Sequence, residues 1–152
     1  MSDRVVLVVA VLAALSCAES LSAAEPEPVV RQAIELTAPE RDYLIAEMHA
    51  NLAAFESLFG ALARDDSRTA EAAASTRGTA GYRSRDSIRP KMLAAKLPPA
   101  FKAMSAALRE SFDQLAAGIA ARETAAQSLD RVSHLTAICN SCHASFRFAT
   151  AP

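Results

Sequence analysis

The residues best suited to chemistry lie together near the C-terminus of the chain. Cys139 and Cys142 are separated by two residues, and His143 follows directly. On a helix, positions three apart share a face, so both thiols are expected on one side. This C-x-x-C-H spacing is the signature of covalent haem attachment, in which each thiol adds to a vinyl group and the imidazole binds iron. The motif predicts one covalent haem c, held by Cys139 and Cys142, with His143 as the proximal axial ligand.

Three other interpretations of the motif compete with haem. Cys139 and Cys142 could form a disulfide in an oxidising compartment. Thiol exchange uses the same spacing, but such motifs usually open a helix that follows a strand. A zinc site would need a further ligand beyond these two thiols and His143. A position deep in a C-terminal helix, in a chain that looks exported, favours haem.

Residues 1–24 have the three-part plan of a secretory signal peptide. Arg4 precedes an apolar run over residues 5–15, and residues 22–24 are the small Ser-Ala-Ala that a signal peptidase recognises. The pattern predicts cleavage near Ala24 and a periplasmic protein. Two alternatives are a buried N-terminal helix and a lipid anchor on Cys17, for which the flanking residues fit in part.

The composition limits the classes of protein to consider. The chain has 152 residues, a net charge of −1, 51% hydrophobic residues, 5% aromatic residues and four glycines. This charge balance gives no reason to expect nucleic acid as a partner. An alanine-rich chain with few glycines is typical of helices. We expect a single domain over residues 25–152, with no integral membrane segment.

Four helices are predicted to position the motif. The first follows a capping box formed by Thr37 and Glu40, and the second covers about residues 67–77. The third begins at the prolines 98–99, and the fourth begins at Thr124. Short turns between most of them favour an all-α fold, an antiparallel four-helix bundle with the haem bound near the C-terminal helix.

The three longer helices each carry an apolar stripe at helical spacing, which is expected to face the core. The stripes are Leu44, Met48, Leu52, Phe55, Phe59 and Leu62 on the first, Phe101, Met104, Leu108, Phe112, Leu115 and Ile119 on the third, and Leu129, Val132, Thr136, Cys139 and His143 on the fourth.

A long connection over residues 78–97 separates the second and third helices. A short helix is expected within it, near Ile88 and Met92. The wider segment 77–102 is rich in arginine and lysine. A solvated loop is the favoured interpretation. The alternatives are a docking patch and a neighbour for an anionic group.

The C-terminal motif resembles that of the cytochrome c′ family. The nine residues from Cys139 read Cys-Asn-Ser-Cys-His-Ala-Ser-Phe-Arg, and the family pattern also places an aromatic residue and then an arginine after the histidine. The resemblance implies that Arg147 lies near the proximal ligand. It also implies a homodimer through the first two helices, although the alanine-rich second helix could equally pack inside.

The resemblance further implies that a first-helix residue faces the other side of the iron. Met48 occupies the apolar stripe of that helix and is the expected distal axial ligand. Ordinary core filling is the alternative role for this methionine. His49 is the rival ligand at the edge of the stripe, and Met104 and Met92 are lesser candidates.

Iron held between histidine and methionine has no open position, which favours electron transfer. The sequence therefore predicts a periplasmic electron carrier, not an enzyme, whose partners are redox proteins. If Met48 is not a ligand, a five-coordinate haem would bind NO or CO instead. A peroxide-reducing site lacks a visible acid–base pair, since His49 is the one nearby candidate.

Overall fold

The computed structural model describes residues 30–150, apart from the side chain of Asp86. The predicted signal peptide, its cleavage near Ala24 and the alternative lipid anchor on Cys17 lie outside these residues. The described chain is mainly helical, as predicted, with one small two-stranded sheet. Its elements are β1 (Gln32–Leu36), α2 (Ala38–Leu62), α3 (Ser67–Ser75), α4 (Thr79–Ser84), η1 (Asp86–Ile88), α5 (Leu93–Lys96), α6 (Pro99–Ala120), α7 (Ala125–Ser145) and β2 (Phe146–Thr150).

The helices begin where the capping residues predict. The backbone N–H of Thr37 donates to Glu40 Oε2 over 2.8 Å, which satisfies a donor at the start of α2. The backbone N–H of Thr124 donates to Gln127 Oε1 over 2.8 Å at the start of α7. Such reciprocal caps supply partners for N–H groups that have none inside the helix. Four consecutive residues are therefore sufficient to predict where α2 and α7 begin.

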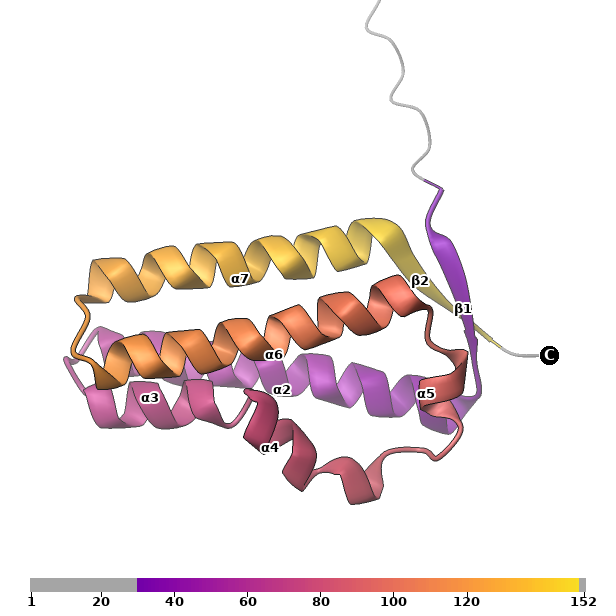
Figure 1. The fold of residues 1–152 in the computed structure, drawn as a ribbon, viewed down its shortest axis with the longest axis horizontal. Helices are drawn as coiled ribbons and strands as arrows, with labels where there is room; N and C mark the ends of the chain where they lie inside the picture. The colour runs from indigo at the N-terminus through magenta and orange to yellow at the C-terminus, as the bar shows by residue number, and fades with distance from the viewer. Residues whose placement is uncertain (1–29, 151–152) are drawn as a thin grey trace, which may run out of the picture.

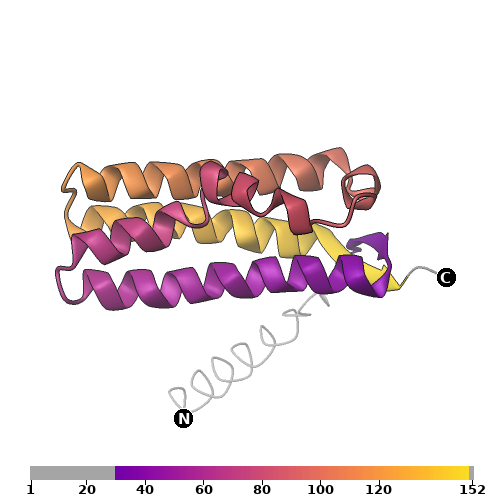
Figure 2. The same ribbon diagram turned by 90° about the horizontal axis from the view of Figure 1, so that it is seen from below.

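Three long helices, α2, α6 and α7, run side by side along the molecule, as Figures 1 and 2 show. A fourth row, beside these three helices, consists of the shorter helices α3, α4, η1 and α5 in succession. Helix α2 packs closely on α3, α3 packs on α6, and α6 packs on α7. In contrast, α2 and α7 make few close approaches to each other. The segment around α4 lies across the molecule from α7 in both views.

A first apolar cluster fills one end of the molecule. It comprises Phe55, Leu58, Ala61, Ala70, Ala73, Ala74, Phe112, Leu115, Ala116, Ile119, Val132 and Leu135. The rings of Phe55 and Phe112 lie 5.5 Å apart between centroids, joining α2 to α6. The small side chains of α3 let it lie close to both of these helices.

The residues that are buried agree with the predicted stripe on α6 and differ from it on α2 and α7. On α2, Leu52 and Phe59 are 64% and 43% exposed, although they were expected in the core. On α7, Leu129 and Thr136 are exposed, and Leu135 is buried instead. The reason is the spacing between α2 and α7: because these helices are held apart, the flanks that face neither α3 nor α6 stay in solvent.

A second apolar cluster fills the opposite end, beneath the sheet. It comprises Ile34, Leu36, Leu93, Phe101 and Phe146, with Cys142 packed at its edge. Strands β1 and β2 are parallel, with Ile34 opposite Phe148. No strand was predicted from the sequence. Helix α7 ends at Ser145, so Arg147 lies on β2 and not on the helix that carries His143.

The connection 78–97 is more ordered than a loop. It contains α4, η1 and α5, and Leu93 of α5 is buried in the second cluster. Gly81 is required where α4 passes the end of α3, because a Cβ atom there would lie 2.2 Å from the carbonyl oxygen of Thr76. No helix within residues 30–150 is long and apolar enough to cross a membrane.

Candidate functional site

A cavity of about 140 Å³, partly open to solvent, lies between α2 and α7, with α4, α5 and α6 contributing its other walls. Much of its wall is apolar and comes from α2, α5 and α6, including Leu44, Leu93, Leu97, Phe101 and Leu108. The cavity occupies the gap between the two apolar clusters.

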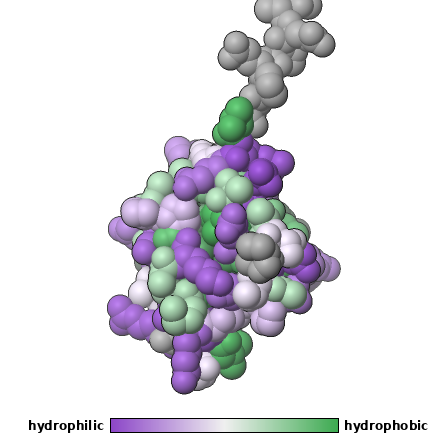
Figure 3. All heavy atoms as spheres, turned by 90° about the vertical axis from the view of Figure 1, so that its right-hand side faces the viewer, coloured by the Kyte–Doolittle hydropathy of each residue, from purple (hydrophilic) through white to green (hydrophobic). Residues whose placement is uncertain are grey.

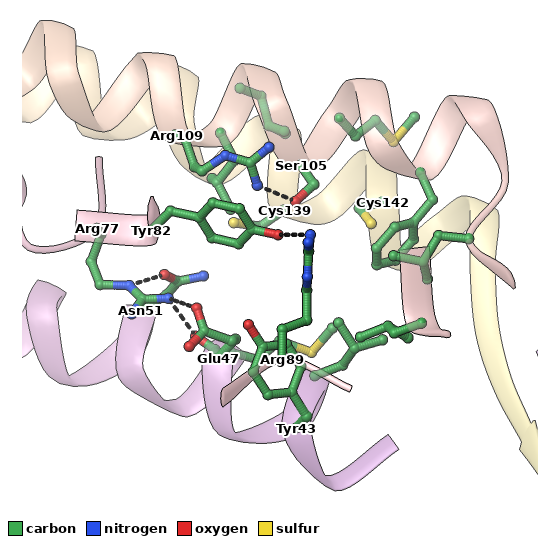
Figure 4. A pocket seen from close by; sticks show the side chains of 18 of the residues that line it. Tyr43, Glu47, Asn51, Arg77, Tyr82, Arg89, Ser105, Arg109, Cys139 and Cys142 are labelled. Atoms are coloured by element: carbon green, nitrogen blue, oxygen red, sulfur yellow. Dashed lines mark hydrogen bonds and ion pairs between the residues drawn. The ribbon is translucent and has the colours of Figure 1, made fainter. Parts of the chain in front are cut away.

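Both cysteines of the motif line this cavity from the last turns of α7 (Figure 4). Cys139 packs against the first apolar cluster and Cys142 against the second, and neither forms a disulfide. Burial raises the pKa of both thiols, and Cys139 raises the pKa of Cys142 further. The carboxyl end of a helix is also its negative end. The two sulfurs are therefore held as neutral thiols at neutral pH.

Neutral thiols at the end of a helix do not suit thiol exchange. Reactive exchange cysteines have a lowered pKa, typically at the amino end of a helix or beside a cation. Cys139 and Cys142 have the opposite environment on both counts. The structure thus argues against the redox interpretation of the motif.

His143 lies at the boundary of the site. Its side chain is exposed, and it lines both the main cavity and a second cavity. Arg147 lines that second cavity from β2. Arg147 and His143 therefore line the same cavity, the arginine from a strand and the histidine from a helix.

Met48 reaches the same place from α2. Its side chain is half-buried and lines both cavities, in each case together with Cys142 and His143. His49 is exposed and lines neither cavity. Met104 lines the main cavity from α6, whereas Met92 is 65% exposed and lines neither. Met48 thus faces the motif across the cavity, and Met104 is the nearest rival on geometry.

One corner of the cavity is a network of charged groups centred on Glu47. Arg77 Nε donates to Asn51 Oδ1 over 2.6 Å, and its Nη2 donates to Glu47 Oε2 over 2.8 Å. Arg85 Nε donates to the other oxygen of Glu47 over 3.2 Å. The two arginines hold the pKa of Glu47 below its usual value, although burial acts in the opposite direction.

A second polar group stands on the α4 and α6 side. The guanidinium of Arg109 lies 4.1 Å from the centroid of the Tyr82 ring, and Arg89 Nη1 donates to the Tyr82 hydroxyl over 3.2 Å. Figure 4 shows Arg89 extending across the cavity from beside Tyr43 to this hydroxyl. The arginines at 77, 85 and 89 belong to the segment expected to be a solvated loop. That expectation is wrong for these three, since they line the cavity.

These features fit a covalently bound haem. Two neutral thiols share one face of a helix, an imidazole follows them, and a thioether stands on the opposite helix. The surrounding apolar wall would exclude water from a flat hydrophobic ring. Within residues 30–150, no three or more His, Cys, Asp or Glu side chains are grouped so that they could hold a metal ion by themselves.

Comparison with known proteins adds no family. No family model matches the sequence, and neither a curated protein nor a solved structure matches it.

The motif residues that line the site from α7 were predicted from the sequence, whereas the polar residues on its other walls were not. Glu47 and Asn51 could have been found, because they lie on the helical turns next to Met48. Tyr82 and Arg109 carried no local signal. They meet only because α4 folds back on α6, and the basic composition of the connection was the single hint.

Proposed function

We propose that this chain is a periplasmic c-type cytochrome that carries one covalent haem and transfers electrons. The observation that carries the proposal is the cavity between α2 and α7, which Cys139, Cys142, His143 and Met48 line together. Haem supplies the one-electron chemistry in such a protein. Cys139 and Cys142 would hold it through thioethers, with His143 as the proximal ligand and Met48 as the distal one.

The proposal includes a cytochrome c′-like four-helix bundle. In this description α2, α6 and α7 are three of the helices, and α3 with α4 supplies the fourth side. The few close approaches between α2 and α7 support it, since a flat cofactor between them needs that separation.

The protein environment would set the reduction potential. A thioether ligand favours ferrous over ferric iron and raises the potential. The apolar side chains of the second cluster, such as Phe101 and Leu93, act in the same direction because burial disfavours the extra ferric charge. Arginines near the cavity oppose that charge as well.

The proposal of export rests on the sequence pattern of residues 1–24. In the periplasm the protein would exchange electrons with other redox proteins that dock where the cavity opens. The end of the molecule that carries the sheet is mixed in character, with hydrophobic residues visible among hydrophilic ones (Figure 3).

The experiment is the absorption spectrum of the full protein, expressed in a host that attaches haem and recorded oxidised, reduced, and reduced under CO. Narrow reduced bands with no CO shift are expected, because both axial positions would be filled. Haem should stay with the chain in denaturing electrophoresis and be lost from the Cys139→Ala, Cys142→Ala double variant. Absence of covalent haem in the parent protein would refute the proposal, and a high-spin spectrum that shifts with CO would indicate the NO- or CO-binding protein instead.

Met48→Ala tests the distal ligand. This variant should open the sixth position, so the ferric spectrum becomes high-spin and the ferrous form binds CO. Met104→Ala is the matched control, because Met104 lines the same cavity from another helix. If Met104→Ala opens the iron and Met48→Ala leaves it low-spin, the assignment of Met48 is wrong.

A further inference from the structure

The cavity wall formed by α4 and α6 holds a cation in a fixed position. Arg109 is half-buried; its Nη1 donates to Ser105 Oγ over 2.8 Å, and its guanidinium lies over the Tyr82 ring. Among the described side chains, no carboxylate oxygen lies within 4 Å of its nitrogens. A guanidinium has five N–H donors, so Arg109 keeps donors for an anion. Its orientation is set before any anion arrives.

Tyr82 adds a donor beside this cation. Its hydroxyl accepts a hydrogen bond from Arg89, and its own proton finds no acceptor among the described residues. A hydroxyl can donate one hydrogen bond while it accepts another. Tyr82 and Arg109 thus present unused donors side by side.

The carboxylate that lines the cavity is already engaged by other arginines. Glu47 on α2 is shared by Arg77 and Arg85, and each of these arginines also donates to a neutral acceptor. Arg109 has no such anionic partner within residues 30–150. The cavity lining therefore has an excess of positive charge on the α4 and α6 side.

We propose that Arg109 and Tyr82, with Arg89 alongside, form the carboxylate site that receives a haem propionate. This inference rests on the proposed function. Vinyl and propionate groups stand on opposite edges of the porphyrin, so a ring attached at Cys139 and Cys142 turns its carboxylates away from α7. Helix α4, which carries Tyr82, lies across the molecule from α7 (Figure 1), and Arg109 reaches the Tyr82 ring from α6 (Figure 4). The site would thereby fix the rotation of the ring about the motif and neutralise a carboxylate inside the cavity.

The test is the reduction potential of the haem-loaded full protein as a function of pH. Protonation of a propionate produces a break in this dependence, and a nearby cation keeps the pKa of the propionate low. In Arg109→Gln the break should move up by about one pH unit or more, as expected for loss of an adjacent charge. Tyr82→Phe, which keeps the ring under Arg109, should move it in the same direction by less.

Two control variants test whether the shift comes from the charge of Arg109. Arg83→Gln removes a charge from an exposed residue of α4 outside the cavity lining and should leave the break in place. Arg109→Lys keeps a charge and should bring the break back towards its parental position. If haem is attached and Arg109→Gln leaves the break unmoved, this inference is wrong and the proposed function stands. If the parent protein attaches no haem, both this inference and the proposed function are wrong.

Discussion

At the scale of single residues, Glu40 joins the start of α2 to α5. Its Oε2 accepts from the backbone N–H of Thr37 and from Lys96 Nζ, the latter over 2.7 Å. These contacts, led by the hydrogen bond from Lys96, hold the pKa of Glu40 below its ordinary value of 4.5. A carboxyl group whose pKa is lowered by folding stabilises the fold at pH values above the pKa it has in the unfolded chain. That stability is lost as the pH falls through the lowered pKa of the folded state.

Lys96→Gln should therefore make the protein less sensitive to acid. The parent should lose stability as the pH falls below about 4.5, the unfolded value. The variant should begin with lower stability at neutral pH and lose less on acidification, because part of the cause of the pKa shift is gone. Thermal unfolding followed by circular dichroism between pH 7 and pH 3 measures both slopes. Lys91→Gln, which removes an exposed lysine, should follow the parent at every pH.

Ser128 is a residue whose replacement should stabilise the protein. Its side chain is fully buried in α7, and its hydroxyl has no hydrogen-bond partner among the described residues. A buried polar group without a partner costs about 1–3 kcal/mol. Ser128→Ala should raise the free energy of unfolding by about 1 kcal/mol in denaturant titration. Exposed Ser133→Ala on the same helix should give only the helix-propensity gain of about 0.5 kcal/mol; an equal gain in both variants would contradict the argument.

At the scale of elements, β1 contributes more to stability than its length suggests. Ile34 is buried beneath the sheet, whereas Val30 just before the strand is 93% exposed. Ile34→Ala should lower the free energy of unfolding by about 2–5 kcal/mol, the usual cost of truncating a buried aliphatic side chain. Val30→Ala should change it by less than about 0.5 kcal/mol. Equal effects in urea titrations would show that β1 is not packed as described.

The elements also divide into those that the sequence predicts and those that it does not. The starts of α2 and α7 follow from capping residues three positions apart, so local sequence is sufficient. The stripe of α6 is buried as predicted because α6 has neighbours on both sides. Leu52 and Leu129 were misplaced, since an apolar stripe does not reveal which flank a partner helix covers. Strands β1 and β2 were missed because each forms only by pairing with the other end of the described chain.

The candidate site divides in the same way. Cys139, Cys142 and His143 lie within one local pattern, so their spacing alone places them on one helix end. Met48 required an assumption about which helix stands opposite, and the structure places it on the shared cavity. The pairing of Tyr82 with Arg109 depends on how α4 folds back, which no short stretch of sequence specifies.

At the scale of the whole molecule, two apolar clusters divide the interior, and they should differ in stability. The first joins three helices through local and neighbouring contacts, whereas the second depends on a sheet that joins distant parts of the chain. In the protein without haem, amide hydrogens of β1 and β2 should exchange faster than those around Phe112 in α6. Exchange measured by mass spectrometry or NMR tests this, and equal protection at both ends would contradict it. On the proposed function, attachment of haem should slow exchange at the sheet end.

The parallel pairing of β1 with β2 has a consequence for how the protein matures. Helices form from residues a few positions apart, whereas this sheet must close a loop over nearly the entire described chain, which costs more entropy. We therefore expect the sheet to be the last element to assemble. On the proposed function, late pairing of β1 with β2 would leave the end of α7 that carries Cys139 and Cys142 open while haem is attached.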